Sequence, residues 1–202
     1  MNYTQLASRE SIEKTLTALK ANGFDAFFVE TGADAKKKVL ELIPDKAGVM
    51  TMTSVTMDTI KVTEEILESG KYEPVKGRLM TMDKNTQGAE MRAMGAAPDF
   101  AVGSVHAVTE EGHVIIASAS GSQLPAYAYG AGKVIWVVGA QKIVKNTEEG
   151  FKRIYGHSLR LENERALKAY GMGSGVNKIL IINKEAKAGR LALILVNEVL
   201  GF

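Results

Sequence analysis

The sequence predicts an α/β fold, a three-layer sandwich whose central sheet is mostly parallel. Short apolar segments rich in β-branched residues alternate with amphipathic helical segments, and this order builds right-handed β-α-β units. In the middle of the chain, two strongly apolar strands bracket a Ser-Gly-Ser turn and a short helix; these strands are His113 to Ser118 and Lys133 to Val138. A turn before the first of them predicts a β-hairpin insertion.

The first quarter of the chain sets the parallel pattern. Apolar residues at helical spacing predict an N-terminal helix over about residues 3–22, ended by Gly23. A strand, a helix and a second strand are predicted next, at Asp25 to Glu30, Asp34 to Ile43 and Ala47 to Met52. The β-α-β order favours parallel pairing of these two strands.

The remaining elements follow in order. Ser54 is placed to cap one or two short helices that run to Ser69, and the stretch from Lys71 to Met82 is irregular. Further helices are predicted at Asp83 to Gly95, Thr147 to Gly156 and Ser158 to Tyr170, and extended segments at Asp99 to Thr109, Asn177 to Asn183 and Leu191 to Val196. No repeat or long linker is evident, so we expect one domain over residues 1–202.

Composition excludes several classes of function. The 25 Lys and Arg against 23 Asp and Glu leave a formal charge of +2, spread along the chain, which offers little support for nucleic-acid binding. The absence of cysteine excludes disulfides and thiolate ligands for zinc or iron-sulfur clusters. Neither a signal-peptide core nor an apolar run long enough to span a bilayer is present. We therefore expect a cytoplasmic protein that does not enter a membrane.

Small and hydroxyl-bearing residues occupy the turns that follow the predicted strands. Because the turns after parallel strands gather at one edge of a sheet, we expect them to form a site for a small anionic or hydroxylated metabolite. The candidate ligand-binding residues are Thr31, Gly32, Thr53, Ser54, Ser120, Gly121, Ser122, Gln123, Gln141 and Lys142. The competing interpretation is that the Ser and Thr residues only cap the helices that follow.

Three other features of the sequence are weaker candidates for a functional role. Gly171 to Gly175 resembles a phosphate loop, but it follows a helix and precedes a strand, so it is interpreted as a helix stop and connector at the wrong edge of the sheet. The three histidines lack the spacing of metal ligands, and no metal site is expected. Glu110, at the tip of the predicted hairpin, is the candidate catalytic residue, as nucleophile or base. A solvated turn residue is the alternative.

Five segments resemble the LUD family, the lactate-utilisation protein domain. They are Thr109 to Val114, Ser120 to Pro125, Val134 to Lys145, Leu161 to Ala166 and Ile194 to Phe202. The resemblance covers nearly the whole chain and is strongest from about Gly88 onward. It implies an α/β sandwich similar to the group of ribose-5-phosphate isomerase, glucosamine-6-phosphate deaminase and CoA transferases.

The resemblance also implies a setting in organic-acid metabolism. Some relatives are subunits of bacterial lactate-oxidation systems, in which an LUD-only subunit works beside iron-sulfur proteins, and the lack of cysteine fits that subunit type. Glu110 to Gly112 matches a Glu-x-Gly element of the family, and CoA transferases of similar fold use a glutamate to carry the acyl group. The family pattern after the next strand is richer in glycine and carries an Arg, where this chain has Gln123.

Two functions remain open at this stage. The first is an accessory or small-anion-binding subunit of lactate utilisation, with iron-sulfur partner proteins. The second is an enzyme that acts on a phosphorylated or CoA-linked metabolite, a transferase or isomerase, with Glu110 as nucleophile or base. No cofactor is required by the sequence, the ligand is unspecified, and a homo-oligomer is compatible with the apolar C-terminal segment.

Overall fold

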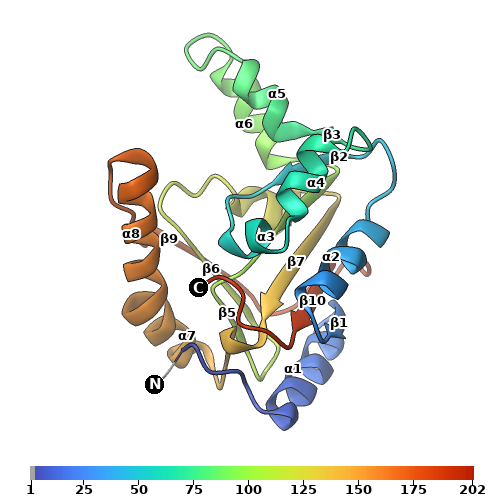
Figure 1. Ribbon diagram of the computed structural model, residues 1–202, viewed down its shortest axis with the longest axis vertical. Coiled ribbons are helices and arrows are strands. Elements are labelled where there is room, and N and C mark those ends of the chain that lie inside the picture. The colour runs from blue at the N-terminus through green and yellow to red at the C-terminus, as the bar shows by residue number, and fades with distance from the viewer. Residues whose placement is uncertain (1–2) are drawn as a thin grey trace.

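The computed structural model describes residues 3–202, and its centre is a six-stranded parallel sheet (Figure 1). The strand order is β1 (Asp25–Val29), β10 (Leu191–Val196), β7 (Lys133–Gly139), β4 (Phe100–Gly103), β2 (Gly48–Thr51) and β3 (Glu73–Pro74). The adjacent interior strands β7 and β10 are almost continuously apolar, which is the pattern of strands buried on both faces.

Helices cover one face of this sheet. They are α2 (Gly32–Glu41), α3 (Val55–Thr59) and α4 (Val62–Glu68). Their buried side chains, among them Val39, Met57 and Ile66, join one core cluster with Ile135 of β7 and Ile194 of β10. Each such fully buried aliphatic side chain stabilises the fold by about 1.5–3 kcal/mol relative to an exposed one.

A second, four-stranded sheet covers the opposite face, together with α1 (Arg9–Ala21). Its strand order is β8 (Ile143–Val144), β5 (Ala107–Thr109), β6 (Val114–Ser118) and β9 (Lys178–Ile182), and β6 runs antiparallel to both of its neighbours. Because side chains alternate along a strand, Val114 and Ile116 point to the central sheet while Ile115 and Ala117 point outward.

The outer face of the second sheet is covered by a nearly continuous helical segment. It consists of α7 (Thr147–Arg153), the π-helical turn η3 (Ile154–Ser158) and α8 (Leu159–Tyr170). Ile154 packs with Ile115 and Ala117 in a third core cluster. A further helical hairpin, α5 (Val75–Thr81) and α6 (Gly88–Ala96), projects at the top of Figure 1.

The α/β class and the mostly parallel sheet agree with the prediction from sequence. The predicted hairpin is also present as β5 and β6, joined through Glu110 to Gly112, but β8 and β9 extend it into a full sheet. One expectation is corrected. The strand before the Ser-Gly-Ser turn and the strand after it were expected to form one strand-loop-helix-strand unit, whereas β6 and β7 belong to different sheets.

Several boundaries also differ from the predictions. The first helix begins at Arg9 rather than near residue 3, because the Ser8 hydroxyl accepts a hydrogen bond from the Ser11 N–H and caps it. The irregular stretch before residue 83 contains β3 and α5, and the helix predicted at Asp83 begins at Gly88. Within residues 3–202, no helix has both the length and the apolar character needed to cross a bilayer.

Gly103 provides a test of how tightly the two layers pack beside β4. A Cβ atom at this position would overlap the hydroxyl oxygen of Tyr127 and press against Met52. Tyr127 is buried on the π-helical turn η1 (Ala126–Gly130), where its ring packs edge-to-face on Trp136 at 5.2 Å. We expect Gly103→Ala to lower the free energy of unfolding by about 1–3 kcal/mol in urea denaturation.

Two variants make this measurement specific. Gly156→Ala adds a methyl group to η3 where nothing lies within 4 Å, so it should change the free energy of unfolding far less. Tyr127→Phe combined with Gly103→Ala removes the nearest clashing atom and should recover part of the loss. Equal stability of Gly103→Ala and the wild-type protein would contradict the packing described.

Candidate functional site

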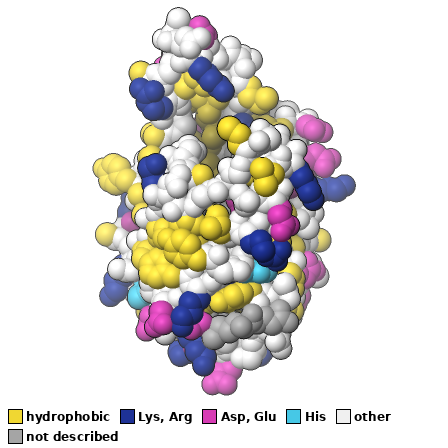
Figure 2. All heavy atoms as spheres, turned by 90° about the vertical axis from the view of Figure 1, so that its left-hand side faces the viewer, with side chains coloured by type: hydrophobic (Ala, Val, Ile, Leu, Met, Phe, Trp, Pro, Cys, Tyr) yellow, Lys and Arg dark blue, Asp and Glu magenta, His cyan; other side chains and the backbone are white. Residues whose placement is uncertain are grey.

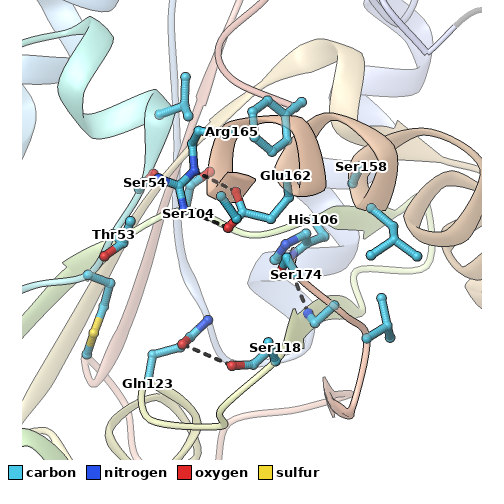
Figure 3. Close-up of a pocket in the computed structure, with 18 of the residues that line it drawn as sticks. Thr53, Ser54, Ser104, His106, Ser118, Gln123, Ser158, Glu162, Arg165 and Ser174 are labelled. Carbon is cyan, nitrogen blue, oxygen red and sulfur yellow. Dashed lines mark hydrogen bonds and ion pairs between the residues drawn. The ribbon is translucent and has the colours of Figure 1, made fainter. Parts of the chain in front are cut away.

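A cavity of about 460 Å³ opens where the two sheets and α8 meet (Figure 3). This volume is within the range of small-molecule sites. In Figure 3, labelled side chains from the start of α3, from the end of β4, from β6 and from α8 surround one space. Eleven of its lining residues carry a hydroxyl group, and they are Thr53, Ser54, Thr56, Ser104, Ser118, Ser120, Ser122, Tyr127, Ser158, Tyr170 and Ser174.

Strand direction explains why these segments meet. The carboxyl ends of β2, β4 and β7 lie at one edge of the parallel sheet and deliver Thr53, Ser104 and Lys142. In the second sheet, β6 runs antiparallel to β5 and β9, so the end of β6 lies beside the beginnings of the other two. Ser118, His106 and the connector before β9 therefore reach the same cavity.

The turn after β6 is held by its own hydroxyl groups. Ser118 Oγ donates to Gln123 Oε1 at 3.2 Å and accepts from the Gly121 N–H at 2.9 Å. The Ser120 and Ser122 hydroxyls lie 3.1 Å apart, and Lys178 Nζ donates to the Ser120 carbonyl at 3.1 Å. Gly121 adopts φ +85°, a conformation that favours glycine. These bonds fix the backbone conformation of the turn, whose serine residues line the cavity.

Lys142 is the buried cation of the cavity wall. Its side chain follows β7 on the 3₁₀ turn η2 (Ala140–Lys142), and the residue is 2% exposed. The Nζ atom donates to Thr56 Oγ1 at 3.2 Å and to Ser104 Oγ at 3.1 Å. Burial, with a smaller contribution from the charge of Arg153, lowers the pKa of Lys142 to about 7. No carboxylate in residues 3–202 forms an ion pair with it.

Arg153 places a second buried cation behind the same wall. It is fully buried at the end of α7, and its Nη1 donates to the His106 carbonyl at 2.6 Å and to Ser158 Oγ at 2.9 Å. Its Nε and Nη2 atoms are buried without a hydrogen-bond partner among the described residues. Burial lowers the pKa of Arg153 to about 10, so the guanidinium keeps its charge at neutral pH.

His106 is the neutral member of this group. Burial and the neighbouring charges of Lys142 and Arg153 lower its pKa to about 3. Its Nδ1 accepts a hydrogen bond from the Ala117 N–H at 3.1 Å, which leaves the proton of the neutral ring on Nε2. The ring lines the cavity as a hydrogen-bond donor rather than a third cation (Figure 3).

The α8 side of the cavity carries an ion pair and an apolar rim. Arg165 donates to both carboxylate oxygens of Glu162 at 2.7 Å, one turn apart on the helix (Figure 3). Tyr170 and Met172 also line the cavity, although they are 61% and 71% exposed. Figure 2, which views the side that carries α8 in Figure 1, shows hydrophobic side chains gathered on this face. The cavity therefore opens beside an exposed apolar surface.

The structure brings together six of the ten predicted ligand-binding residues. Those that line the cavity are Thr53, Ser54, Ser120, Ser122, Gln123 and Lys142. Gly121 shapes the turn without lining it. Thr31 caps α2 by accepting from the Asp34 N–H, and the Gly32 N–H donates to Glu198. Gln141 donates to the carbonyls of Leu200 and Gly201 and thereby holds the last residues of the chain against η2.

Glu110 lies at the other end of its strand from the cavity, so the structure does not bring this candidate catalytic residue together with the candidate ligand-binding residues. It stands four residues beyond His106, roughly 13 Å along an extended strand. Its carboxylate accepts hydrogen bonds from Lys14 Nζ at 2.8 Å and Ser11 Oγ at 2.7 Å, and these bonds lower its pKa. Glu110 lies in the turn before β6, whereas Ser118 is the last residue of β6, so the two residues are at opposite ends of that strand. Glu110 therefore cannot share a site with Ser118.

Sequence reasoning missed two parts of the site. The Gly171 to Gly175 connector does end α8, since Gly171 caps it in the left-handed conformation, but Gly173, Ser174 and Gly175 also line the cavity. Because β9 is antiparallel to β6, the beginning of β9 is the correct edge after all. Glu162 and Arg165 of α8, which were not among the predicted site residues, also border the cavity. Their spacing with Ser158 and Ala166 on one helix face was the available signal.

Metal ligands are not grouped in the described part of the chain: residues 3–202 contain no cluster of three or more His, Asp or Glu residues arranged to hold an ion.

Comparison with solved structures supports the fold. The chain is similar to a DUF162 family protein from Deinococcus radiodurans, with a TM-score of 0.60 and 13% identity over 96% of this chain and 100% of that one. It also resembles a D-ribose-5-phosphate isomerase solved in complex with phospho-erythronic acid (TM-score 0.37, 16% identity, 65% of this chain and 66% of that one). A ribose 5-phosphate isomerase from Plasmodium falciparum is similar to the same degree (TM-score 0.36, 15% identity, 69% and 64%).

The isomerase TM-scores are too low to support an inference about ligand or reaction. None of the curated proteins matches the chain. The LUD domain family, in contrast, matches residues 12–196, which include both sheets and every part of the cavity except Phe202. The resemblance seen in the sequence is thereby confirmed, and the chain belongs to the LUD domain family.

Proposed function

We propose that this protein binds a small organic anion in the cavity, as the anion-binding subunit of an organic-acid utilisation system. The observation that carries the proposal is the pair of buried cations, Lys142 and Arg153, without a carboxylate partner among the described residues. Hydroxyl groups on three sides of the cavity supply further donors. A carboxylate or phosphate group would meet both requirements at once.

The energetics favour an anion over a neutral ligand. Burying an unpaired cation costs free energy, and the lowered pKa values of Lys142 and Arg153 reflect that cost. An anion bound beside them restores the missing counter-charge in a place that water screens poorly. Glu162 does not supply this charge, because Arg165 binds both of its oxygens.

Family membership supports organic acids, lactate among them, as the ligand class. Iron-sulfur proteins are proposed as partners, since the 202 residues contain no cysteine that could hold a cluster. The exposed apolar side chains beside the cavity, Tyr170 and Met172, are compatible with a partner surface there. The alternative enzyme with Glu110 as nucleophile has no support from the geometry, because that carboxylate lies outside the cavity.

Calorimetric titration with L-lactate and inorganic phosphate at pH 7 tests the proposal. We expect saturable binding of at least one of these anions, and Lys142→Met should weaken it about tenfold or more because the compensating charge is lost. Adding Ser122→Ala to that variant should abolish measurable binding. The matched control is Lys14→Met, which removes a lysine paired with Glu110 outside the cavity. Equal losses in the two lysine variants, or no binding to the wild-type protein, would refute the proposal.

The affinity for lactate should also depend on pH. Burial lowers the pKa of Lys142 to about 7, so the empty site holds an ammonium below that pH and a neutral amine above it. Only the ammonium attracts the carboxylate. Affinity should therefore fall as pH rises from about 7 to 9, by up to about tenfold per pH unit, with proton uptake on binding. Titrations in two buffers of different ionisation enthalpy measure this uptake, and Lys14→Met should behave like the wild-type protein. A pH-independent affinity would count against Lys142 as the anion ligand.

A further inference from the structure

Lys142 differs from the lysines that serve ion pairs in this protein. Lys14, Lys133 and Lys152 each contact a carboxylate at 2.8–3.5 Å, and their charges are thereby compensated. Lys142 contacts two hydroxyl oxygens instead, and it borders the cavity while the rest of its side chain is buried. This environment holds the amine in place without requiring it to be charged.

Such an environment is the one in which a lysine amine becomes a nucleophile. Removal from water disfavours the ammonium, and the nearby guanidinium of Arg153 disfavours it further. At neutral pH a substantial fraction of Lys142 is therefore a free amine. Lys142 lines a cavity that a small molecule can enter.

We propose that the Lys142 amine forms a reversible imine with a 2-oxo acid bound in the cavity, an inference that rests on the proposed anion binding. The Nζ lone pair forms a bond to the carbonyl carbon, and the carbonyl oxygen takes up a proton as the C=O π bond breaks. The resulting carbinolamine loses this oxygen as water and leaves a C=N bond to Nζ. Addition of water reverses the sequence, so the step needs no oxidant or reductant.

The surroundings of Nζ suit both parts of this reaction. The Ser104 hydroxyl, 3.1 Å from Nζ, can accept the proton that leaves nitrogen while it passes its own proton to the departing oxygen. Thr56 Oγ1, at 3.2 Å, donates its proton to the Leu200 carbonyl and so holds the amine in place. The carboxylate of a 2-oxo acid lies next to its carbonyl carbon. When Nζ attacks that carbon, the carboxylate stays within the field of Arg153 and the protonated imine. A neutral ketone has no negative charge to compensate Arg153 and the protonated imine, so a 2-oxo acid is favoured over it.

Reductive trapping tests the inference on the intact protein. Pyruvate is the probe, with sodium cyanoborohydride as the reagent that reduces an imine to a stable secondary amine. We expect the wild-type protein to gain the mass of one pyruvic acid less one oxygen atom, and peptide mapping to place the addition on Lys142. Lactate, which has no keto group, should leave the mass unchanged and should slow the labelling when added with pyruvate.

The controls separate chemistry from binding and from misfolding. Lys142→Arg keeps a cation but has no amine that can form the imine, so only the background labelling of exposed lysines should remain. The matched control Lys14→Arg replaces a lysine outside the cavity and should keep the labelling at Lys142. The wild-type peptide map does not depend on how any variant folds. Labelling spread over surface lysines with none enriched at Lys142, or the absence of protection by lactate, would overturn the inference. Lactate binding without pyruvate trapping would leave the proposed function standing and remove only the imine.

Discussion

The hydrogen bonds of the buried Arg153 guanidinium are the interaction on which the site depends. Its Nη1 joins the His106 carbonyl, at the start of β5, to the Ser158 hydroxyl, at the end of the π-helical turn. Charge-assisted bonds of this kind are stronger than neutral ones, and a buried guanidinium with fewer partners would cost several kcal/mol. The second sheet and the helix that covers it are therefore tied together at the wall of the cavity.

This arrangement sets the electrostatics of the whole pocket. Arg153 adds to the burial that keeps His106 neutral and that brings the pKa of Lys142 to about 7. π-helical turns are rare and are frequently found at functional sites, and both η1 and η3 contribute side chains to this lining. A pocket with a deficit of negative charge results, and the proposed anion binding and the proposed amine chemistry at Lys142 both rest on that deficit.

The parts of the fold that could be predicted were those with local causes. Apolar runs of β-branched residues indicated β7 and β10, and the caps at Ser54 and Gly171 indicated where helices begin and end. Lys142 and the Ser120 to Ser122 turn were identified because each directly follows an apolar strand. Thr31 and Gln141 satisfied the same criterion, but the first only caps its helix and the second binds backbone carbonyls.

The errors had a common cause, which was the sheet to which each strand belongs. Glu110 and the Gly171 to Gly175 connector were interpreted as if the hairpin and the strand after the connector belonged to the central sheet, whereas they form a second sheet. Antiparallel pairing of β6 with β5 and β9 reverses which ends meet, so it moves Glu110 away from the cavity and brings Ser174 into it. Arg153 was missed because charged residues on a helix are usually solvated.

By itself the sequence determined the α/β class, the family, the positions of most helices and strands, and the absence of any thiolate chemistry in these residues. Only the tertiary structure decided which polar residues form the site. The physical reason is that local patterns depend on neighbours along the chain, whereas burial and charge at Lys142 depend on residues 38 and 86 positions away, at Ser104 and Thr56, which strand pairing alone brings into contact.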